Sequence, residues 1–187
     1  MRKRKGSTIA EFGPALMLCF GVFVFPLWAF GTIGMRYLFL LNAARLAAQS
    51  AARSQSFLSD TNPSASPPAL SAVHNAQNVA SMACNQIGGM LGSTHGVTLS
   101  STNVYIKVCP IGGKTSSYTQ PAANTALTSA AQPISYTYNC EVVLTASIQP
   151  LCPGMKTFVG SIPGFNTPYI TNARADYLFE NTNNLNL

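Results

Sequence analysis

Residues 2–36 read RKRKGSTIAEFGPALMLCFGVFVFPLWAFGTIGMR, and this stretch decides how the rest of the chain is organised. Four basic residues precede Gly6, and the 24 residues from Phe12 to Met35 carry no charge. A helix of about 20 apolar residues is long enough to cross the hydrocarbon core of a bilayer. Because basic flanks stay on the cytoplasmic side, the sequence predicts a single-pass membrane helix whose C-terminal part is exported.

Glu11 is an unusual residue at the start of this apolar run. A charged side chain inside a membrane costs about 2.5–3.5 kcal/mol on insertion scales, and by default it marks a functional position. A plain membrane anchor gives no reason for a carboxylate five residues after Gly6.

The basic leader, Gly6, Ser7 and Glu11 together resemble the processing site of type IV pilins and pseudopilins. The chain beyond the apolar run resembles the TadE-like minor pilins of tight-adherence (Flp-type) pilus systems. The matching residues are Phe30-Gly31, Arg36-Tyr37, Asn42-Ala43-Ala44-Arg45, Ala48, Ala51, Ala52 and Arg53. Pro14 stands earlier than the usual proline of this pattern, and Ser7 replaces the bulkier residue common in ordinary pilins.

The resemblance implies a minor pilin or pseudopilin that takes part in assembling a Flp-type pilus or a related secretion fibre. It implies cleavage between Gly6 and Ser7 by a prepilin peptidase, and a role for Glu11 in docking the subunit into the assembly. The implied partners are that peptidase, other minor pilins, the major pilin and an inner-membrane pilus platform. The implied location is the bacterial inner membrane, with a cytoplasmic N-terminus and a periplasmic C-terminal domain that can enter an extracellular pilus.

Other interpretations of the leader remain open. A plain signal anchor fits the length equally well and would make the protein a signal-anchored periplasmic binding or adhesion domain, but it leaves Glu11 unexplained. A cleaved signal peptide has an apolar core of about 7–15 residues followed by a small-residue cleavage site. The run here is longer and lacks such a site. An exported thiol enzyme is a more distant alternative.

The net charge of +6 is mostly a signal of topology. Four of the eleven Lys and Arg residues lie in the leader, which leaves seven against five acids elsewhere. No basic cluster with interleaved aromatic residues indicates nucleic-acid binding. His74 and His95 are expected on the surface, and Glu141, Asp176 and Glu180 are expected to be solvated. No spacing predicts acid–base catalysis, a metal site or a phosphate loop, so we expect no enzyme activity and no cofactor.

The sequence predicts four segments: a basic leader, a transmembrane and extended helix, a linker, and a periplasmic domain, at residues 1–6, 7–54, 55–68 and 69–187. Pro14 and Pro26 are expected to interrupt the long helix. Beyond the membrane, Ala44, Ala48, Ala51 and Ala52 form a stripe of small residues. The stripe either lets another helix approach closely or simply reflects the high helix propensity of alanine.

The periplasmic domain is predicted to be α+β, with a second helix packed on an antiparallel sheet of three or four strands, as in pilins. The helix should begin near Pro67 with Ser66 as its cap and end at Gly88-Gly89. Strands are expected at 103–108, at 134–149, where apolar and polar residues alternate, and at 169–180. The segment 112–133 should form a long surface loop.

Four cysteines lie on the predicted exported side, namely Cys84, Cys109, Cys140 and Cys152. An even number in an oxidising compartment predicts two disulfides. The apolar faces on which they lie favour Cys84 with Cys140, whereas hairpin order favours Cys109 with Cys140. A Cys140–Cys152 bond is disfavoured, because an extended strand between them would separate their Cα atoms beyond roughly 7 Å.

Overall fold

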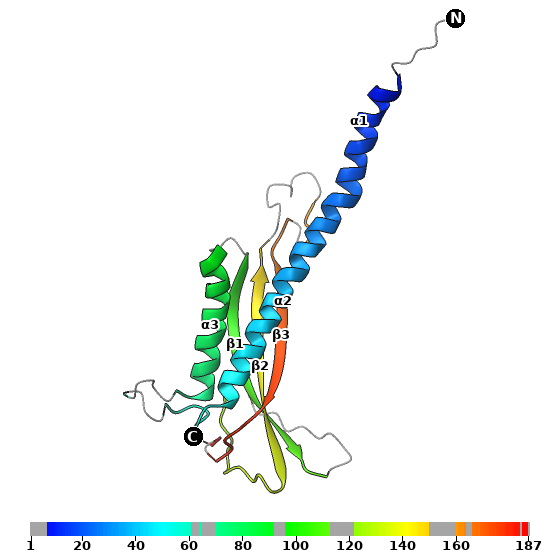
Figure 1. Ribbon diagram of the computed structural model, residues 1–187. Coiled ribbons are helices and arrows are strands. Elements are labelled where there is room, and N and C mark those ends of the chain that lie inside the picture. Colours follow the sequence, from blue (N-terminus) through cyan, green and yellow to red (C-terminus); the bar gives the residue numbers. More distant parts are fainter. Residues whose placement is uncertain are drawn as a thin grey trace, which may run out of the picture.

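The computed structural model describes residues 7–60, 64, 70–91, 96–112, 122–149, 160–163, 166–183 and 185–186. The protein is α+β, as predicted: a long apolar N-terminal helix and a second helix pack on a three-stranded antiparallel sheet (Figure 1). The elements in chain order are α1 (Ser7–Cys19), a π-helical turn η1 (Phe20–Val24), α2 (Phe25–Ala52), α3 (Ala72–Leu91), β1 (Val97–Pro110), β2 (Tyr136–Ile148) and β3 (Tyr169–Leu178).

The elements α1, η1 and α2 follow one another without a break and form one helical rod. Pro14 lies inside α1 without ending it. The wide turn η1 ends at Val24, two residues before Pro26, which occupies the first turn of α2. Proline lacks an N–H and its ring crowds the carbonyl four residues earlier, which here belongs to Val22 of η1. A single π-helical turn accommodates that missing hydrogen bond within the rod.

The two halves of the rod have different surroundings (Figure 1). The C-terminal half of α2 packs on β2 and β3 and alongside α3, whereas α1 and the start of α2 extend past the end of the sheet. The packed half buries one face completely. Its buried residues are Leu40, Ala43, Ala44, Ala47, Ala48, Ala51 and Ala52.

Alanine dominates the contact between the two helices. The buried residues of α3 include Ala72, Ala76 and Ala80, which repeat every four residues and lie on one face of the helix. Because an alanine side chain ends at Cβ, two such faces allow the helix backbones to approach closely. The alanine stripe of α2 is therefore a packing surface inside the domain.

In the sheet, β2 is the central strand, paired antiparallel with β1 and β3. Val142 lies opposite Val104 on one side and Ala175 on the other. These residues share the face that the two helices cover, with α3 over β1 and α2 over β2 and β3. The even-numbered residues of β2 from Tyr138 to Ile148 are all buried on this face, which confirms the alternation expected from the sequence.

The alternation of the expected strand 134–149 does not give buried residues at its start. Ile134 is 92% exposed and precedes β2, and Tyr136, the first residue of β2, is also exposed. The β1–β2 hairpin extends beyond the last turn of α2, so the helix does not cover its tip (Figure 1). Alternation in the sequence records which face a residue occupies, but not where the covering helix ends.

Two element boundaries also differ from the expected ones. α3 begins at Ala72, where the Ser71 hydroxyl accepts a hydrogen bond from the His74 N–H, and it continues past the two glycines to Leu91. The expected cap Ser66 and the adjacent Pro67 lie outside the described residues. β1 begins at Val97, because the polar Ser and Thr residues that precede 103 still pair with the far end of β2.

Candidate functional site

The candidate site is the N-terminal rod and its junction with the sheet. Gly6 lies outside the described residues. Ser7 and Glu11 belong to α1, and their side chains lie outside the described part of the structure. The backbone thus places Ser7 at the first residue of the helix and Glu11 about one turn later, at the outer end of the rod.

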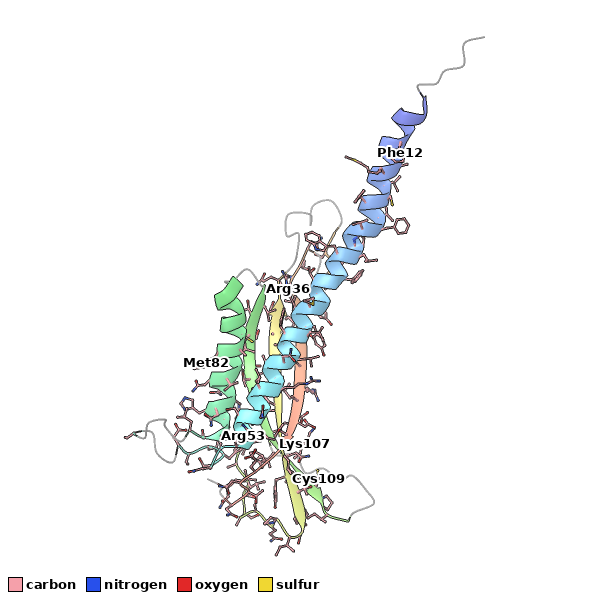
Figure 2. The ribbon with its side chains drawn as sticks, viewed as in Figure 1. Phe12, Arg36, Arg53, Met82, Lys107 and Cys109 are labelled. Carbon is pink, nitrogen blue, oxygen red and sulfur yellow. The ribbon has the colours of Figure 1, made fainter. Side chains whose placement is uncertain are left out.

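The rod from Phe12 to Val24 exposes every residue, and its large apolar side chains project into open space (Figure 2). Met17 is 81% exposed and Leu27, in the next element, is 77% exposed. Within the described residues, one helix is long and apolar enough to cross a membrane. A water-exposed surface of this kind is unfavourable, so these side chains need an apolar environment.

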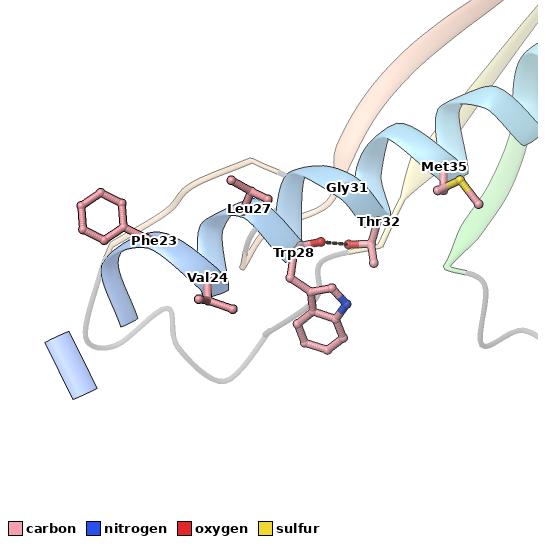
Figure 3. A pocket seen from close by; sticks show the side chains of 7 residues that line it. All are labelled: Phe23, Val24, Leu27, Trp28, Gly31, Thr32 and Met35. Atoms are coloured by element: carbon pink, nitrogen blue, oxygen red, sulfur yellow. Dashed lines mark hydrogen bonds between the residues drawn. The ribbon is translucent and has the colours of Figure 1, made fainter. Parts of the chain in front are cut away.

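One face of this exposed part is hollowed (Figure 3). The hollow measures about 640 Å³ and is lined by Phe23, Val24, Leu27, Trp28, Gly31, Thr32 and Met35. Gly31 adds no side chain to this hollow, and a Cβ at that position would meet no atom within 4 Å. The Thr32 hydroxyl donates to the Trp28 and Ala29 carbonyls, at 3.1 and 2.9 Å, so its hydrogen bond stays within the helix. An apolar neighbour can therefore contact this surface without leaving that hydroxyl unpaired.

Arg36 ends the uncharged run at the level where the sheet begins (Figure 2). Its Nη1 donates to the Gln149 carbonyl, at 2.7 Å, one residue after β2. Gln149 in turn donates its N–H to the Gly96 carbonyl, next to the start of β1. Gly96 has φ +62°, and a Cβ there would lie 2.9 Å from Gln149 Cβ and 3.1 Å from Arg36 Cζ. Only glycine fits under the guanidinium in this conformation.

The residues that carry the TadE-like pattern divide between core and surface. Ala43, Ala44, Ala48, Ala51 and Ala52 are buried against the domain. Arg53 follows the helix and pairs with Glu180, with Nε 3.1 Å from Oε1, and the Glu180 N–H donates to the Ala52 carbonyl. The end of α2 is thus tied to the residues that follow β3. The alanines of this pattern are therefore explained by packing within the domain.

A second polar cluster lies on the outer face of the sheet, and the sequence did not predict it. Lys107 Nζ is 2.8 Å from Asp176 Oδ2 and 3.2 Å from Glu141 Oε1, so one ammonium joins carboxylates from two other strands. Glu141 is only 4% exposed, with Arg174 4.0 Å away. The expectation of a solvated Glu141 was wrong, because long side chains on the neighbouring strands cover the central strand. The register, which brings Asp176 opposite Glu141, was the signal that the sequence alone lacked.

Burial lowers the pKa of Lys107, but hydrogen bonds to Asp176 and Glu141 outweigh it and leave the pKa raised. The amine therefore stays charged, which matches its role between two carboxylates. This arrangement favours a stable ion-pair network on the sheet.

His74 and Asp60 form a third polar contact, at the start of α3. Asp60 Oδ1 accepts from the Ser71 N–H at 2.7 Å, and Oδ2 lies 3.1 Å from His74 Nδ1. The backbone hydrogen bond from Ser71, followed by that from His74, lowers the pKa of Asp60. His74 is exposed as expected but has a carboxylate partner, and the pair fixes the start of the helix. His95 lies outside the described residues.

Cys84, Cys109 and Cys140 are free thiols, so neither favoured disulfide is formed. Cys109 lies opposite Thr137, three positions from the Ile106–Cys140 pair and on the other face of the sheet. Cys84 packs against the core from α3, which contacts β1 and α2, while α2 covers Cys140. Burial raises the pKa of the Cys140 thiol to about 12, which keeps it protonated and unreactive. Cys152 lies outside the described residues.

Among the described residues no group of three or more His, Cys, Asp or Glu side chains could hold a metal ion. Comparison with protein-family models, curated proteins and solved structures finds no match for this chain. The architecture itself is pilin-like: a long N-terminal apolar helix, bare over its first half, packs its second half on an antiparallel sheet.

Proposed function

We propose that this protein is a TadE-like minor pilin or pseudopilin that takes part in the assembly of a Flp-type pilus or a related secretion fibre. The observation that carries the proposal is the division of one continuous helix. Its first half is exposed and apolar, and its second half forms part of the core of a small α+β domain. A helix of this kind anchors the domain to a membrane and leaves an apolar rod for contact with other subunits.

The point at which the division occurs supports a membrane location. The uncharged run from Phe12 to Met35 has 24 residues and would span about 36 Å as a helix, enough for a hydrocarbon core of about 30 Å. Arg36 follows at once and contacts the end of the sheet. The basic leader would lie in the cytoplasm and the sheet in the periplasm.

The leader and Glu11 supply the rest of the proposal. Cleavage between Gly6 and Ser7 by a prepilin peptidase would give Ser7 a new α-amino group. The partners would be other minor pilins, the major pilin and an inner-membrane platform, and we propose no enzymatic activity for this chain. A carboxylate inside a bilayer is costly, and an ammonium of an adjacent subunit would offset part of that cost. Such a pair would set the axial register between neighbouring rods.

The test is Glu11→Ala in a strain whose only copy carries the change. Surface fibres counted by electron microscopy should be abolished or greatly reduced, while membrane insertion is retained, because removing a charge favours insertion. Glu11→Gln, which keeps the size of the side chain but not its charge, should behave in the same way. Leu18→Ala, a truncation in the same exposed run, is the matched control and should leave fibres near the wild-type number.

Normal piliation with Glu11→Ala would contradict the proposal. It would favour the alternative, a signal-anchored periplasmic binding or adhesion domain, for which Glu11 has no role.

A further inference from the structure

β3 is an edge strand, and the backbone of its outer edge is unpaired within the described residues. The Phe179 N–H donates to the Tyr138 carbonyl, directly after the Leu178–Asn139 pair, so Phe179 points its backbone toward β2. Residues of an antiparallel strand alternate between pointing toward one neighbour and away from it. The outward N–H and C=O groups are therefore those of Ile170, Asn172, Arg174, Asp176 and Leu178.

The opposite edge of the same sheet is protected. The Val104 N–H donates to Asn124 Oδ1 at 2.9 Å, and the Asn124 N–H donates to the Val104 carbonyl at 2.8 Å. β1 also has an irregular register between Leu99 and Ser101, and its last residue is Pro110. Asn124 thus acts as a plug, which here means a loop residue hydrogen-bonded to the edge of the strand. Covering groups of this kind, bulges and prolines are among the devices that prevent a strand from pairing with another chain.

Within the described residues β3 has no such plug, and the strand itself carries no bulge and no proline. Its ten residues pair with β2 in one unbroken register and include no proline, lysine or glycine. Apolar side chains are exposed at both ends, with Ile170 at 70% and Leu178 at 57%. Arg174 and Asp176, also exposed, lie between them on the same face. A straight edge with exposed apolar ends is a template for an added strand.

We propose that β3 accepts an extended strand of a different polypeptide, which adds to the sheet antiparallel to β3 as a fourth strand. The backbone groups of the edge fix the chemistry of the occupant, because only another extended backbone satisfies a row of alternating donors and acceptors. The occupant would place apolar side chains beside Ile170 and Leu178 and polar side chains beside Arg174 and Asp176.

The direction of the strands argues against a second copy as the occupant. β1 and β3 both run away from the end of the sheet that Arg36 contacts. A copy anchored in the same membrane would therefore offer its own edge strands only in parallel with β3, and its β1 edge is plugged. Antiparallel pairs are the more stable ones, and they require a strand that runs toward the membrane. This step rests on the membrane anchoring proposed above.

The experiment uses full-length protein in its native membrane, with a photo-crosslinking amino acid at Ile170 on β3 or at Ser101 on β1. Both positions are exposed. We expect a covalent adduct with another polypeptide from position 170 and none from position 101. Mass spectrometry of the adduct identifies the partner.

Two substitutions at Asn172 separate backbone from side chain. Asn172→Pro removes an outward N–H that the sheet does not use, and Asn172→Ala keeps that N–H. The adduct from position 170 should fall about tenfold with proline, and it should stay within about twofold of wild type with alanine. Protease resistance of the domain, unchanged in both variants, shows that the sheet is intact.

Three results would overturn the proposal. Position 170 could give no adduct, positions 170 and 101 could give equal adducts, or Asn172→Pro could leave the adduct from position 170 unchanged. An adduct with a second copy of this chain would overturn the choice of occupant. These results are independent of fibre counts, since the crosslink reports on β3 alone. Normal piliation with Glu11→Ala would contradict the proposed role of Glu11 but not strand addition to β3. The absence of an adduct from position 170 would contradict strand addition but not the role of Glu11.

Discussion

Lys107 holds two carboxylates on a face of the sheet that lies away from both helices, and one of them is almost fully buried. Removing the ammonium would take away the cation 3.2 Å from the buried Glu141 carboxylate, whereas Arg174 lies 4.0 Å away. We expect Lys107→Met to lower the free energy of unfolding by about 2–4 kcal/mol, because loss of an ion-pair partner from a buried charge is costly. Denaturant unfolding of the purified full-length protein measures it.

Arg174→Met is the matched control for that change. The Arg174 side chain is 67% exposed and at the limit of an ion pair with Glu141, so its loss should cost less than about 1 kcal/mol. If both substitutions lowered the free energy of unfolding equally, the shorter distance from Lys107 to Glu141 would not be what stabilises the cluster.

Asp60 makes stability depend on acid pH. Its pKa is lowered in the folded protein, so its contribution is present above the unfolded pKa of about 3.9 and is lost as the pH falls through the folded value. We expect Asp60→Asn to lower the melting temperature at pH 6 and to converge with wild type near pH 2. A constant difference between the two melting curves across this range would show that the Asp60 charge is not involved.

At the scale of elements, the packing of α2 on the domain depends on alanine. Ala48 of α2 is fully buried in the core, which leaves no space there for a larger side chain. We expect Ala48→Leu to destabilise the protein by about 1–3 kcal/mol through overpacking. Asn42→Leu, on the exposed side of the same helix, should change stability by less than about 0.5 kcal/mol. Thermal unfolding of both variants compares them, and equal stability would contradict tight packing of α2 on the domain.

The elements that the sequence predicted well are those with a long, regular pattern. The alternation in β2 gave both the strand and its buried face, and the uncharged run gave the rod. The start of α3 was missed because its cap, Ser71, receives help from Asp60, eleven residues earlier. The pattern of residues within the helix does not show a hydrogen bond to a residue outside it, such as the one between Ser71 and Asp60.

The candidate site was less predictable than the fold. The ion pairs of Glu141 come from three different strands, so they exist only once the register is set. The relative placement of the cysteines has the same origin, because Cys109 and Cys140 lie on opposite faces of the sheet only once the register is set, and α2 covers Cys140. In the sequence Arg36 marks only the end of the uncharged run, because its contact with Gln149, 113 residues later, depends on the fold.

At the scale of the whole molecule, the exposed apolar rod and the domain are parts of one piece. No loop separates them, and the only irregularity in the rod is η1, within the exposed half. The guanidinium of Arg36 fastens the rod to the end of the sheet at the level where the domain begins. The orientation of the rod therefore fixes the orientation of the sheet, including its open edge.

This continuity also decides how the molecule would carry a mechanical load. A pull along the rod would reach the domain as a sliding force along the buried face from Leu40 to Ala52, so that all of its contacts would resist together. A helix joined to its domain by a flexible loop would instead be peeled away one contact at a time. A load on the sheet would therefore reach the whole rod, and a load on the rod would reach the sheet, without passing through a separate joint.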